Sequence, residues 1–240
     1  MGTMGSRSLQ LGGSAVWTAT EQVVDRARQV AAELLEANVA DIELDMDRGV
    51  FHVAGTPSVS KTWAEVGTAG DIVDPVGGGA MGLPIEAALT FSAENATFPF
   101  GAHVAEVEVD TRLGRVHVLR IAAAHDVGRA INPVLVEGQI EGGVAQGIGM
   151  ALMEEFTPGR GENLHDYLIP TIGDVPPIES ILVERASSAG PFGAKGIGEQ
   201  ALIPTAPAIL NAIHHATGAR ITRIPATPDR VLAALRKPAP

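Results

Sequence analysis

Residues 103–154 read HVAEVEVDTRLGRVHVLRIAAAHDVGRAINPVLVEGQIEGGVAQGIGMALME, and this stretch decides the fold class. Residues 103–109 alternate apolar and polar side chains, which is typical of a strand. The turn-forming residues 110–114 separate it from a second run of this kind, 115–123. The pattern predicts two strands joined by a tight turn.

A long helix is expected next. Pro133 opens it in the position that proline favours, and the apolar pattern continues to about Glu154. Glycines inside an exposed helix cost about 1 kcal/mol each relative to alanine. This helix contains several, so we expect a neighbouring helix or a ligand to approach closely at Gly138, Gly142, Gly143, Gly147 and Gly149.

The remaining elements alternate irregularly along the chain. Thr18 and Glu21 have the spacing of a capping box for the first helix, and Thr62 and Glu65 have the same spacing. We expect a helix over 19–37, a hairpin of 42–46 with 50–54, a helix over 62–69, strands over 83–93 and 178–184, helices over 199–216 and 228–236, and loops at 77–79, 157–177 and 190–198. The sequence therefore predicts an α+β fold with two-layer lobes of mixed sheet and helix, about 1–98 and 99–240.

Composition excludes several classes of function. The net charge is −11, whereas a nucleic-acid surface needs a basic stripe. The chain has no cysteine, so it offers no iron–sulfur ligand and no thiol nucleophile. It has no apolar run long enough for a membrane span and no apolar stretch of the signal-peptide type at its start. We expect a cytoplasmic protein that binds neither nucleic acid nor membrane.

Three glycine-rich segments carry hydrogen-bond donors: 2–8, 125–133 and 193–199. Backbone amides in such loops hold anions well, so together they are candidates to grip a large phosphorylated cofactor. The alternative is that each is only a turn. Residues 196–201 also form a loose dinucleotide fingerprint, which leaves an independent nucleotide-binding module as a weaker hypothesis.

Glu199 has two interpretations. It is either a first-turn acid favoured by a helix dipole or a general base exposed on a glycine-bounded turn. The histidines lack metal-ligand spacing, and no side chain is predicted to ligate a metal. Only His125, beside Asp126 at a strand end, is a candidate site residue among them.

Taken together, these segments closely resemble the large subunits of molybdenum hydroxylases, the family of aerobic carbon monoxide dehydrogenase, xanthine dehydrogenase and aldehyde oxidase. The resemblance is carried by residues 5–8, 99–110, 125–133, 136–149, 166–170 and 193–199, in the order the family has them. It identifies the chain as the C-terminal, molybdopterin-binding part of such a subunit.

The resemblance implies a molybdopterin cytosine dinucleotide cofactor and oxidation of a small substrate with oxygen derived from water. Glu199 matches the family's active-site glutamate and is expected to act as the base. The expected cofactor-binding residues are Thr3, Gly5, Ser6, Arg7, Ser8, His125, Asp126, Gly128, Arg129, Asn132, Gln146, Gly193, Ala194, Lys195, Gly196 and Ile197.

The resemblance also implies partners. Iron–sulfur clusters and FAD are expected on other subunits, and the N-terminal half of the large subunit is expected to supply further cofactor contacts. A family subunit is roughly three times as long as this chain, and its copper-binding cysteine loop would lie upstream. The substrate, whether carbon monoxide, an aldehyde or an N-heterocycle, stays open.

Two further points follow from the resemblance. His125 stands where an acid is expected. The shortness of the chain leaves a shortened protein, a split subunit or a gene fragment as its origin. The alternative function is therefore a non-catalytic fragment that folds and associates without binding metal.

Overall fold

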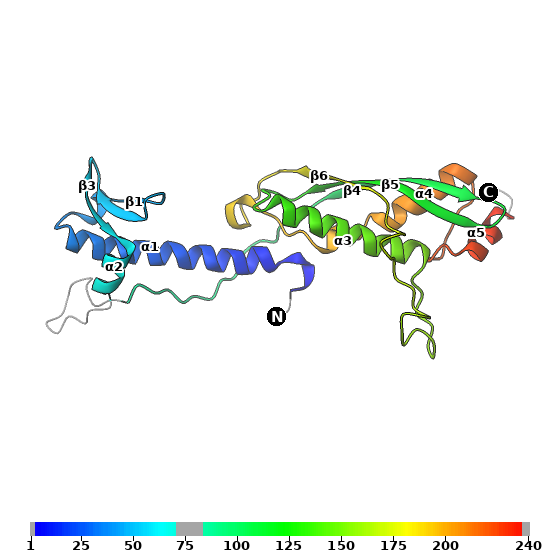
Figure 1. Ribbon diagram of the computed structural model, residues 1–240, viewed down its shortest axis with the longest axis horizontal. Coiled ribbons are helices and arrows are strands. Elements are labelled where there is room, and N and C mark those ends of the chain that lie inside the picture. Colours follow the sequence, from blue (N-terminus) through cyan, green and yellow to red (C-terminus); the bar gives the residue numbers. More distant parts are fainter. Residues whose placement is uncertain (1–2, 71–83, 237–240) are drawn as a thin grey trace. The chain divides into compact units, whose positions relative to one another are not determined.

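The computed structural model describes residues 3–70 and 84–236, and the chain forms two compact units (Figure 1). The smaller unit is Gly12–Ser92, and the larger unit joins Met1–Leu11 to Ala93–Pro240. The expected lobes placed the N-terminal residues in the first lobe, whereas here the first eleven belong to the larger unit. Within the described ranges, no helix is long and apolar enough to cross a membrane.

The smaller unit packs two helices against a three-stranded antiparallel sheet. The hairpin expected near 42–54 is confirmed, and a third strand, which the sequence did not predict, follows it. The elements are α1 (Ser14–Leu34), β1 (Ile42–Asp45), β2 (Val50–Val53), β3 (Thr56–Thr62) and α2 (Trp63–Gly70). The third strand was missed because its polar, mostly exposed residues show no apolar alternation.

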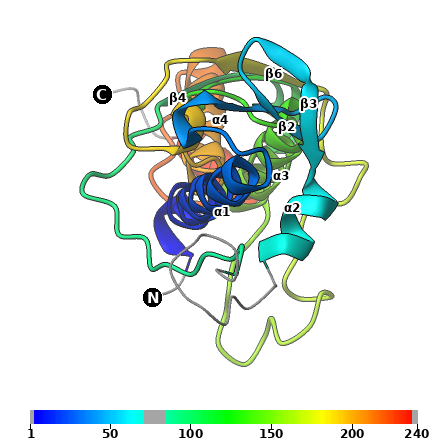
Figure 2. The same ribbon diagram turned by 90° about the vertical axis from the view of Figure 1, so that its left-hand side faces the viewer.

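One apolar cluster holds the smaller unit together. Ala27 and Val30 of α1 are buried against Phe51 of β2 and Val66 of α2. The ring of Trp63 meets Phe51 edge to face, with ring centroids 4.6 Å apart. Figure 2, which looks along α1, shows α2 beside it at the end of β3.

The two expected capping boxes have different outcomes. Thr62 and Glu65 form one at the start of α2: the Thr62 backbone N–H donates to the Glu65 carboxylate at 2.8 Å, and the Glu65 N–H donates to the Thr62 hydroxyl at 3.2 Å. The box expected from Thr18 and Glu21 is wrong. The helix α1 begins earlier, at Ser14, and follows a π-helical segment, Leu9–Gly13. Thr18 therefore lies inside the helix.

The strand expected over 83–93 is also wrong. Residue 83 lies outside the described residues, as does the expected loop at 77–79, and residues 84–93 form no regular element. Pro84 cannot donate to a strand ladder. A run of apolar residues becomes a strand only where another strand pairs with it, and the described residues provide none here.

The larger unit contains a mixed three-stranded sheet in the order β4-β5-β6. The strands β4 (Gly101–Asp110) and β5 (Arg115–Asp126) form the expected antiparallel pair, and β6 (Ile178–Val183) pairs with β5 in parallel. Parallel strands need a crossover connection, which α3 (Pro133–Leu152) provides. The α+β class expected from the sequence is confirmed.

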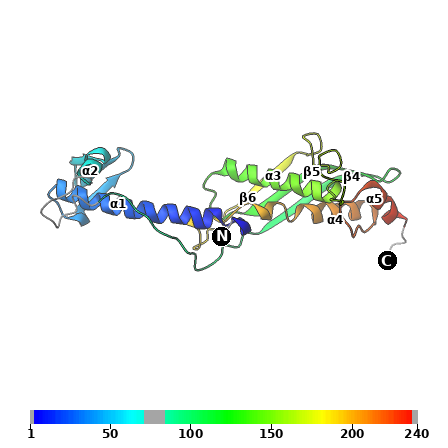
Figure 3. The same ribbon diagram turned by 90° about the horizontal axis from the view of Figure 1, so that it is seen from below.

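Helices cover one face of this sheet. Figure 3 shows α3 and α4 (Thr205–Thr217) side by side against it, and α5 (Pro228–Leu235) packs on β5. Their shared core contains Ile121 of β5, Ile140 and Ile148 of α3, and Ile209 and Ile213 of α4. The other face leaves Val104 and Ile181 exposed.

The helix expected over 199–216 is corrected. Glu199–Ala201 forms a separate 3₁₀ turn, and α4 starts only at Thr205. The reason is Pro204, which disfavours helical geometry in the residue before it. The expected end is confirmed, since Gly218 closes α4 in the left-handed conformation at φ 72°.

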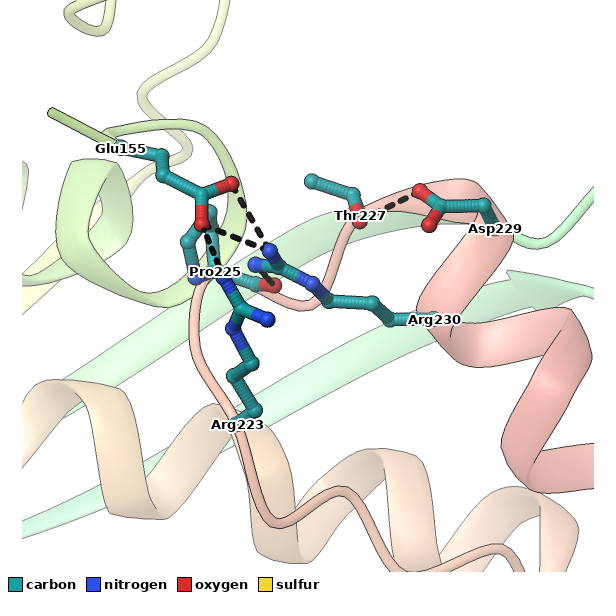
Figure 4. Close-up of polar contacts among 6 residues, drawn as sticks. All are labelled: Glu155, Arg223, Pro225, Thr227, Asp229 and Arg230. Atoms are coloured by element: carbon teal, nitrogen blue, oxygen red, sulfur yellow. Dashed lines mark hydrogen bonds and ion pairs between the residues drawn. The ribbon is translucent and has the colours of Figure 1, made fainter. Parts of the chain in front are cut away.

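An ion-pair cluster fastens the C-terminal segment to the end of α3 (Figure 4). Arg230 of α5 donates to both carboxylate oxygens of Glu155, at 2.6 and 2.8 Å, and Arg223 donates to one at 2.7 Å. These hydrogen bonds, first from Arg230 and then from Arg223, lower the pKa of Glu155. Arg230 also donates to the carbonyl of Pro225, so the segment before α5 is fixed at two points.

Candidate functional site

The larger unit contains a cavity of about 720 Å³. Three separate parts of the chain line it: the N-terminal loop, one face of α3, and the segment around Glu199. We call it the α3 cavity. Its lining residues are Thr3, Met4, Ser6, Ser8, Leu9, Gly138, Gln139, Gly142, Gly143, Gln146, Ile197, Gly198, Glu199 and Leu202.

The N-terminal loop is fixed to the larger unit by its own polar groups. The buried side chain of Gln10 donates to the carbonyls of Asn95 at 2.6 Å and Ala189 at 3.1 Å. The hydroxyls of Thr3 and Ser8 are hydrogen-bonded to each other. The loop therefore presents its hydroxyl groups to the cavity from a held position.

Glycines let the N-terminal loop reach the third glycine-rich segment. A Cβ atom at Gly196 would lie 1.9 Å from the carbonyl oxygen of Ser6, and one at Gly198 would lie 3.0 Å from the Ser6 hydroxyl. A side chain at residue 196 would thus collide with backbone. Two segments that the sequence marked separately are in direct contact because this glycine has no side chain.

The glycines of α3 divide into two groups. A Cβ atom at Gly143 would lie 2.6 Å from Ala201, and one at Gly147 would lie 2.3 Å from Thr205. The expectation that a neighbouring element approaches the helix is confirmed at these positions. At Gly138 and Gly142 an added Cβ would meet nothing within 4 Å, and both residues line the cavity.

Glu199 is the charged residue among the described residues that line the cavity. Its backbone N–H donates to the Ser6 hydroxyl at 2.9 Å, and that hydroxyl donates to Oε2 of Glu199 at 3.1 Å. Because Glu199 begins a 3₁₀ turn of three residues, it is not the first residue of the long helix α4. The interpretation of Glu199 as a first-turn acid therefore applies to this 3₁₀ turn and not to the long helix expected over 199–216.

The second glycine-rich segment lies against the third. The N–H of Lys195 donates to the carbonyl of Val127 at 2.9 Å, and the N–H of Arg129 donates to the carbonyl of Gly193 at 3.1 Å. Gly128 forms a bridge with Ala194. These residues therefore support the segment that leads to Glu199 and do not line the cavity described above.

A buried ion pair joins the same two segments. Lys195 donates to the Asp126 carboxylate at 2.6 Å, and both side chains are largely buried. Burial works against the ionised form of Asp126. The hydrogen bonds from Lys195 and from the N–H of Gly128 outweigh this effect, so the pKa of Asp126 lies below its ordinary value. Asp126 remains charged at neutral pH and holds Lys195 in place.

The structure brings together part of the expected site. Thr3, Ser6, Ser8, Gln146, Ile197 and Glu199 line the α3 cavity, and Gly5 and Arg7 lie in the same loop. Asn132 caps α3, where its side chain accepts the Leu135 N–H at 3.2 Å. His125 is fully buried and paired with His103 at 2.7 Å, away from the lining residues.

The expected cofactor-binding residues did not include the lining residues Met4, Leu9, Gly138, Gln139, Gly142, Gly143, Gly198 and Leu202. The sequence marked the three helical glycines only as points of close approach, and it marked Met4 and Gly198 only as members of glycine-rich segments. A signal for the helical ones was present. Gln139 precedes Gln146 by seven residues, and Gly138 precedes Gly142 by four, so each pair shares a helix face. Across the ranges 3–70 and 84–236, no group of three or more histidine, aspartate or glutamate side chains forms a metal site.

Comparisons with known proteins give a consistent result. The family model described as "Molybdopterin cofactor-binding domain" matches residues 1–176. The chain is 34% identical over 239 residues to 6-hydroxypseudooxynicotine dehydrogenase complex subunit gamma of Paenarthrobacter nicotinovorans, covering 96% of this chain and 30% of that protein. It is 32% identical over 246 residues to the carbon monoxide dehydrogenase large chain of Hydrogenophaga pseudoflava, covering 99% and 30%.

A solved structure gives the same match. Quinoline 2-oxidoreductase from Pseudomonas putida 86 aligns with a TM-score of 0.83 and 35% identity, covering 97% of this chain and 30% of that one. The chain thus spans about 30% of the length of these relatives. Two of the relatives are, by name, parts of larger assemblies: a complex subunit and a large chain.

Proposed function

Since the chain belongs to the molybdopterin cofactor-binding domain family, we propose that it provides the cofactor-binding part of a molybdenum-dependent oxidoreductase and that the α3 cavity receives the cofactor. One observation carries the proposal. The cavity brings the N-terminal loop, a face of α3 and the segment around Glu199 together from three distant parts of the chain.

The lining residues fit a large, polar organic group. On the α3 side the wall is bare backbone at Gly138 and Gly142, where an added Cβ would enter open space. Hydroxyl groups of Ser6 and Ser8 and the amide of Gln146 add neutral donors and acceptors. Such a wall allows close approach of a flat ring system and of phosphate oxygens, and it adds no charge to that of Glu199.

The roles of the residues follow from this placement. The Thr3, Ser6 and Ser8 hydroxyls and the Gln139 and Gln146 amides would orient the cofactor by hydrogen bonds. The cofactor, proposed to be molybdopterin cytosine dinucleotide, supplies the redox chemistry, as cofactors generally do. The segments 126–132 and 193–196 would support the part of the cavity wall around Glu199 without contacting the cofactor.

Glu199 is proposed as the active-site base. Its carboxylate lies in the cavity wall, and the Ser6 hydroxyl holds one of its oxygens at 3.1 Å. A carboxylate in this position can accept a proton when water-derived oxygen is transferred to a substrate. Replacement by glutamine keeps the shape and removes the proton acceptor, so Glu199→Gln is expected to abolish turnover while the cofactor stays bound.

The substrate is proposed only as a class. The relatives are named for a hydroxylated pseudooxynicotine, carbon monoxide and quinoline. These have in common only that each is a small molecule that can be oxidised. The rest of a large subunit, and partner chains with iron–sulfur clusters and FAD, are proposed to complete the enzyme. Location in the cytoplasm remains a prediction from the sequence.

The first measurement is molybdenum per chain after co-expression with the genomic neighbours in a host that makes the cofactor. About one molybdenum per complex supports the proposal. Absence of both molybdenum and a co-purifying partner would favour the alternative, a fragment that folds and associates without metal. The exposed Val104 and Ile181 on the open face of the sheet favour association in that case.

A pair of matched glycine variants tests where the cofactor binds. Gly142→Leu places a side chain in the cavity, and overpacking of about 1–3 kcal/mol corresponds to roughly 5- to 150-fold weaker binding. Leucine is also the better helix former by about 0.5–1 kcal/mol, so the cofactor-free chain is expected to be no less stable.

Gly67→Leu is the control, since Gly67 lies in α2 with nothing within 4 Å of an added Cβ. We expect molybdenum content to fall in Gly142→Leu and to stay unchanged in Gly67→Leu. Equal molybdenum content in both variants would place the cofactor elsewhere.

A further inference from the structure

Ser6 combines an unusual backbone conformation with two hydrogen bonds to one residue. Its φ is 53°, in the left-handed region, directly after Gly5 at φ 75°. Glycine adopts this region freely, whereas serine does so at a cost of about 1 kcal/mol. Such a conformation persists in a protein only where the surroundings hold it, and it is often found at functional sites.

The surroundings of Ser6 are built around its close approach to one segment. Its carbonyl oxygen faces Gly196, where an added Cβ atom would lie 1.9 Å from that oxygen. Its hydroxyl faces Gly198, where an added Cβ atom would lie 3.0 Å from the hydroxyl oxygen. The hydroxyl accepts the Glu199 N–H at 2.9 Å and donates to Oε2 of the same residue at 3.1 Å. One oxygen atom therefore fixes both the backbone and the carboxylate of Glu199.

We propose that Ser6 is a positioning residue that holds the Glu199 carboxylate in its orientation toward the cavity. The hydroxyl leaves Oε1 of Glu199 free of this contact, while Oε2 is tied to the N-terminal loop. An orientation fixed before the substrate arrives removes rotamer freedom that would otherwise oppose proton transfer. The proposal rests on the proposed function of Glu199 as base.

The contact itself is tested first in the full chain without cofactor, by a double-mutant cycle. Ser6→Ala removes two hydrogen bonds worth about 1 kcal/mol each and is expected to lower the Tm by about 4–8 °C, whereas Glu199→Ala removes one and is expected to lower it by about 2–4 °C. The double variant is expected to lose less than the sum of the two, because both substitutions remove the same Ser6–Glu199 side-chain contact. Additive losses would overturn the proposal.

Backbone strain is separated from hydroxyl loss by a second variant, Ser6→Gly. Glycine relieves the left-handed strain, so Ser6→Gly is expected to have a higher Tm than Ser6→Ala. Both variants lack the hydroxyl, so their kcat is expected to fall by the same factor. In the complete complex, kcat per bound molybdenum is expected to fall about 10- to 100-fold with KM little changed.

Three results are decisive. Thr68→Ala is the control. It removes a hydroxyl of α2, in the smaller unit, that donates to the carbonyl of Ala64 in the same helix, and it is expected to keep full kcat. If activity of the Ser6 variants fell only in proportion to their molybdenum content, Ser6 would be a cofactor contact alone and the positioning role would be rejected. If Glu199→Gln kept full turnover while the double-mutant cycle showed coupling, the contact would stand and the proposed base would fail.

Discussion

The half-buried His103 and the buried His125 form a pair that illustrates what individual residues contribute to the larger unit. Their Nε2 atoms lie 2.7 Å apart, and Nδ1 of His103 lies 3.1 Å from the Thr205 hydroxyl. Among the described residues, Nδ1 of His125 has no hydrogen-bond partner. The neutral arrangement that leaves no N–H of the pair unpaired therefore has His125 donating to His103 and His103 donating to Thr205. Thr205 then donates to the carbonyl of Ala201, the last residue of the 3₁₀ turn that begins at Glu199.

This pair predicts a loss of stability in mild acid. Burial, and then the neighbouring His125, lower the pKa of His103 to about 4, and burial lowers the pKa of His125. Below about pH 6.5 the unfolded chain binds protons that the folded chain does not, so the free energy of unfolding falls as the pH drops from 6.5 towards 4. We expect a loss of about 1–2 kcal/mol, since solvent contact of His103 screens part of the effect.

Urea unfolding between pH 7 and 4.5 measures this loss. His103→Gln is expected to give a flatter dependence, because it removes one of the two titrating groups. A slope unchanged by the substitution would show that other groups control the acid response.

At the scale of elements, α3 has different neighbours along its length. Near its middle and end, Gly143 and Gly147 pack against Ala201 and Thr205. Nearer its start, Gly138 and Gly142 face the cavity. A single glycine-rich helix thus contacts a protein element with one part of its surface and leaves room for a ligand with another.

Gly147→Ala is expected to destabilise the chain by about 1–3 kcal/mol, because the new Cβ would overlap Thr205 and disturb its hydrogen bond with His103. Gly67→Ala, which meets nothing within 4 Å, is expected to stabilise it by about 0.5–1 kcal/mol through helix propensity. Chemical denaturation of the two variants measures the difference. Equal stabilities would mean that α4 moves away from α3 without cost.

At the scale of the whole molecule, the described residues form two apolar cores. Phe51 belongs to the core of the smaller unit, and Ile213 belongs to that of the larger unit. The proposed cofactor site is lined entirely by residues of the larger unit, five of which lie between Thr3 and Leu9. Stability of the smaller unit and cofactor binding are therefore expected to respond to different substitutions.

Phe51→Ala is expected to cost the smaller unit about 3–5 kcal/mol, and Ile213→Ala is expected to cost the larger unit about 2–5 kcal/mol. Amide hydrogen exchange followed residue by residue should show faster exchange in 14–70 for the first variant and in 101–235 for the second. Uniform acceleration along the whole chain in both variants would show one cooperative unit instead.

The sequence by itself determined the local features. Alternation over 103–123 and helical periodicity from Pro133 predicted β4, β5 and α3, since these patterns depend on side chains close together in the chain. Thr62 and Glu65 predicted the start of α2 for the same reason. The resemblance of the glycine-rich segments to a known family predicted the family to which the chain belongs.

Only the tertiary structure decided which distant residues meet. Ser6 and Glu199 are 193 positions apart, and no local pattern predicts their hydrogen bonds. Residues 84–93 have strand-forming side chains but pair with no strand in the part of the chain that the structure describes. Gly142 faces a cavity, whereas Gly147 faces a helix. The physical reason is that pairing and close approach depend on how elements pack against each other. Packing depends on the surfaces of all the elements in a unit together, whereas a stretch of sequence determines only the surface of its own element.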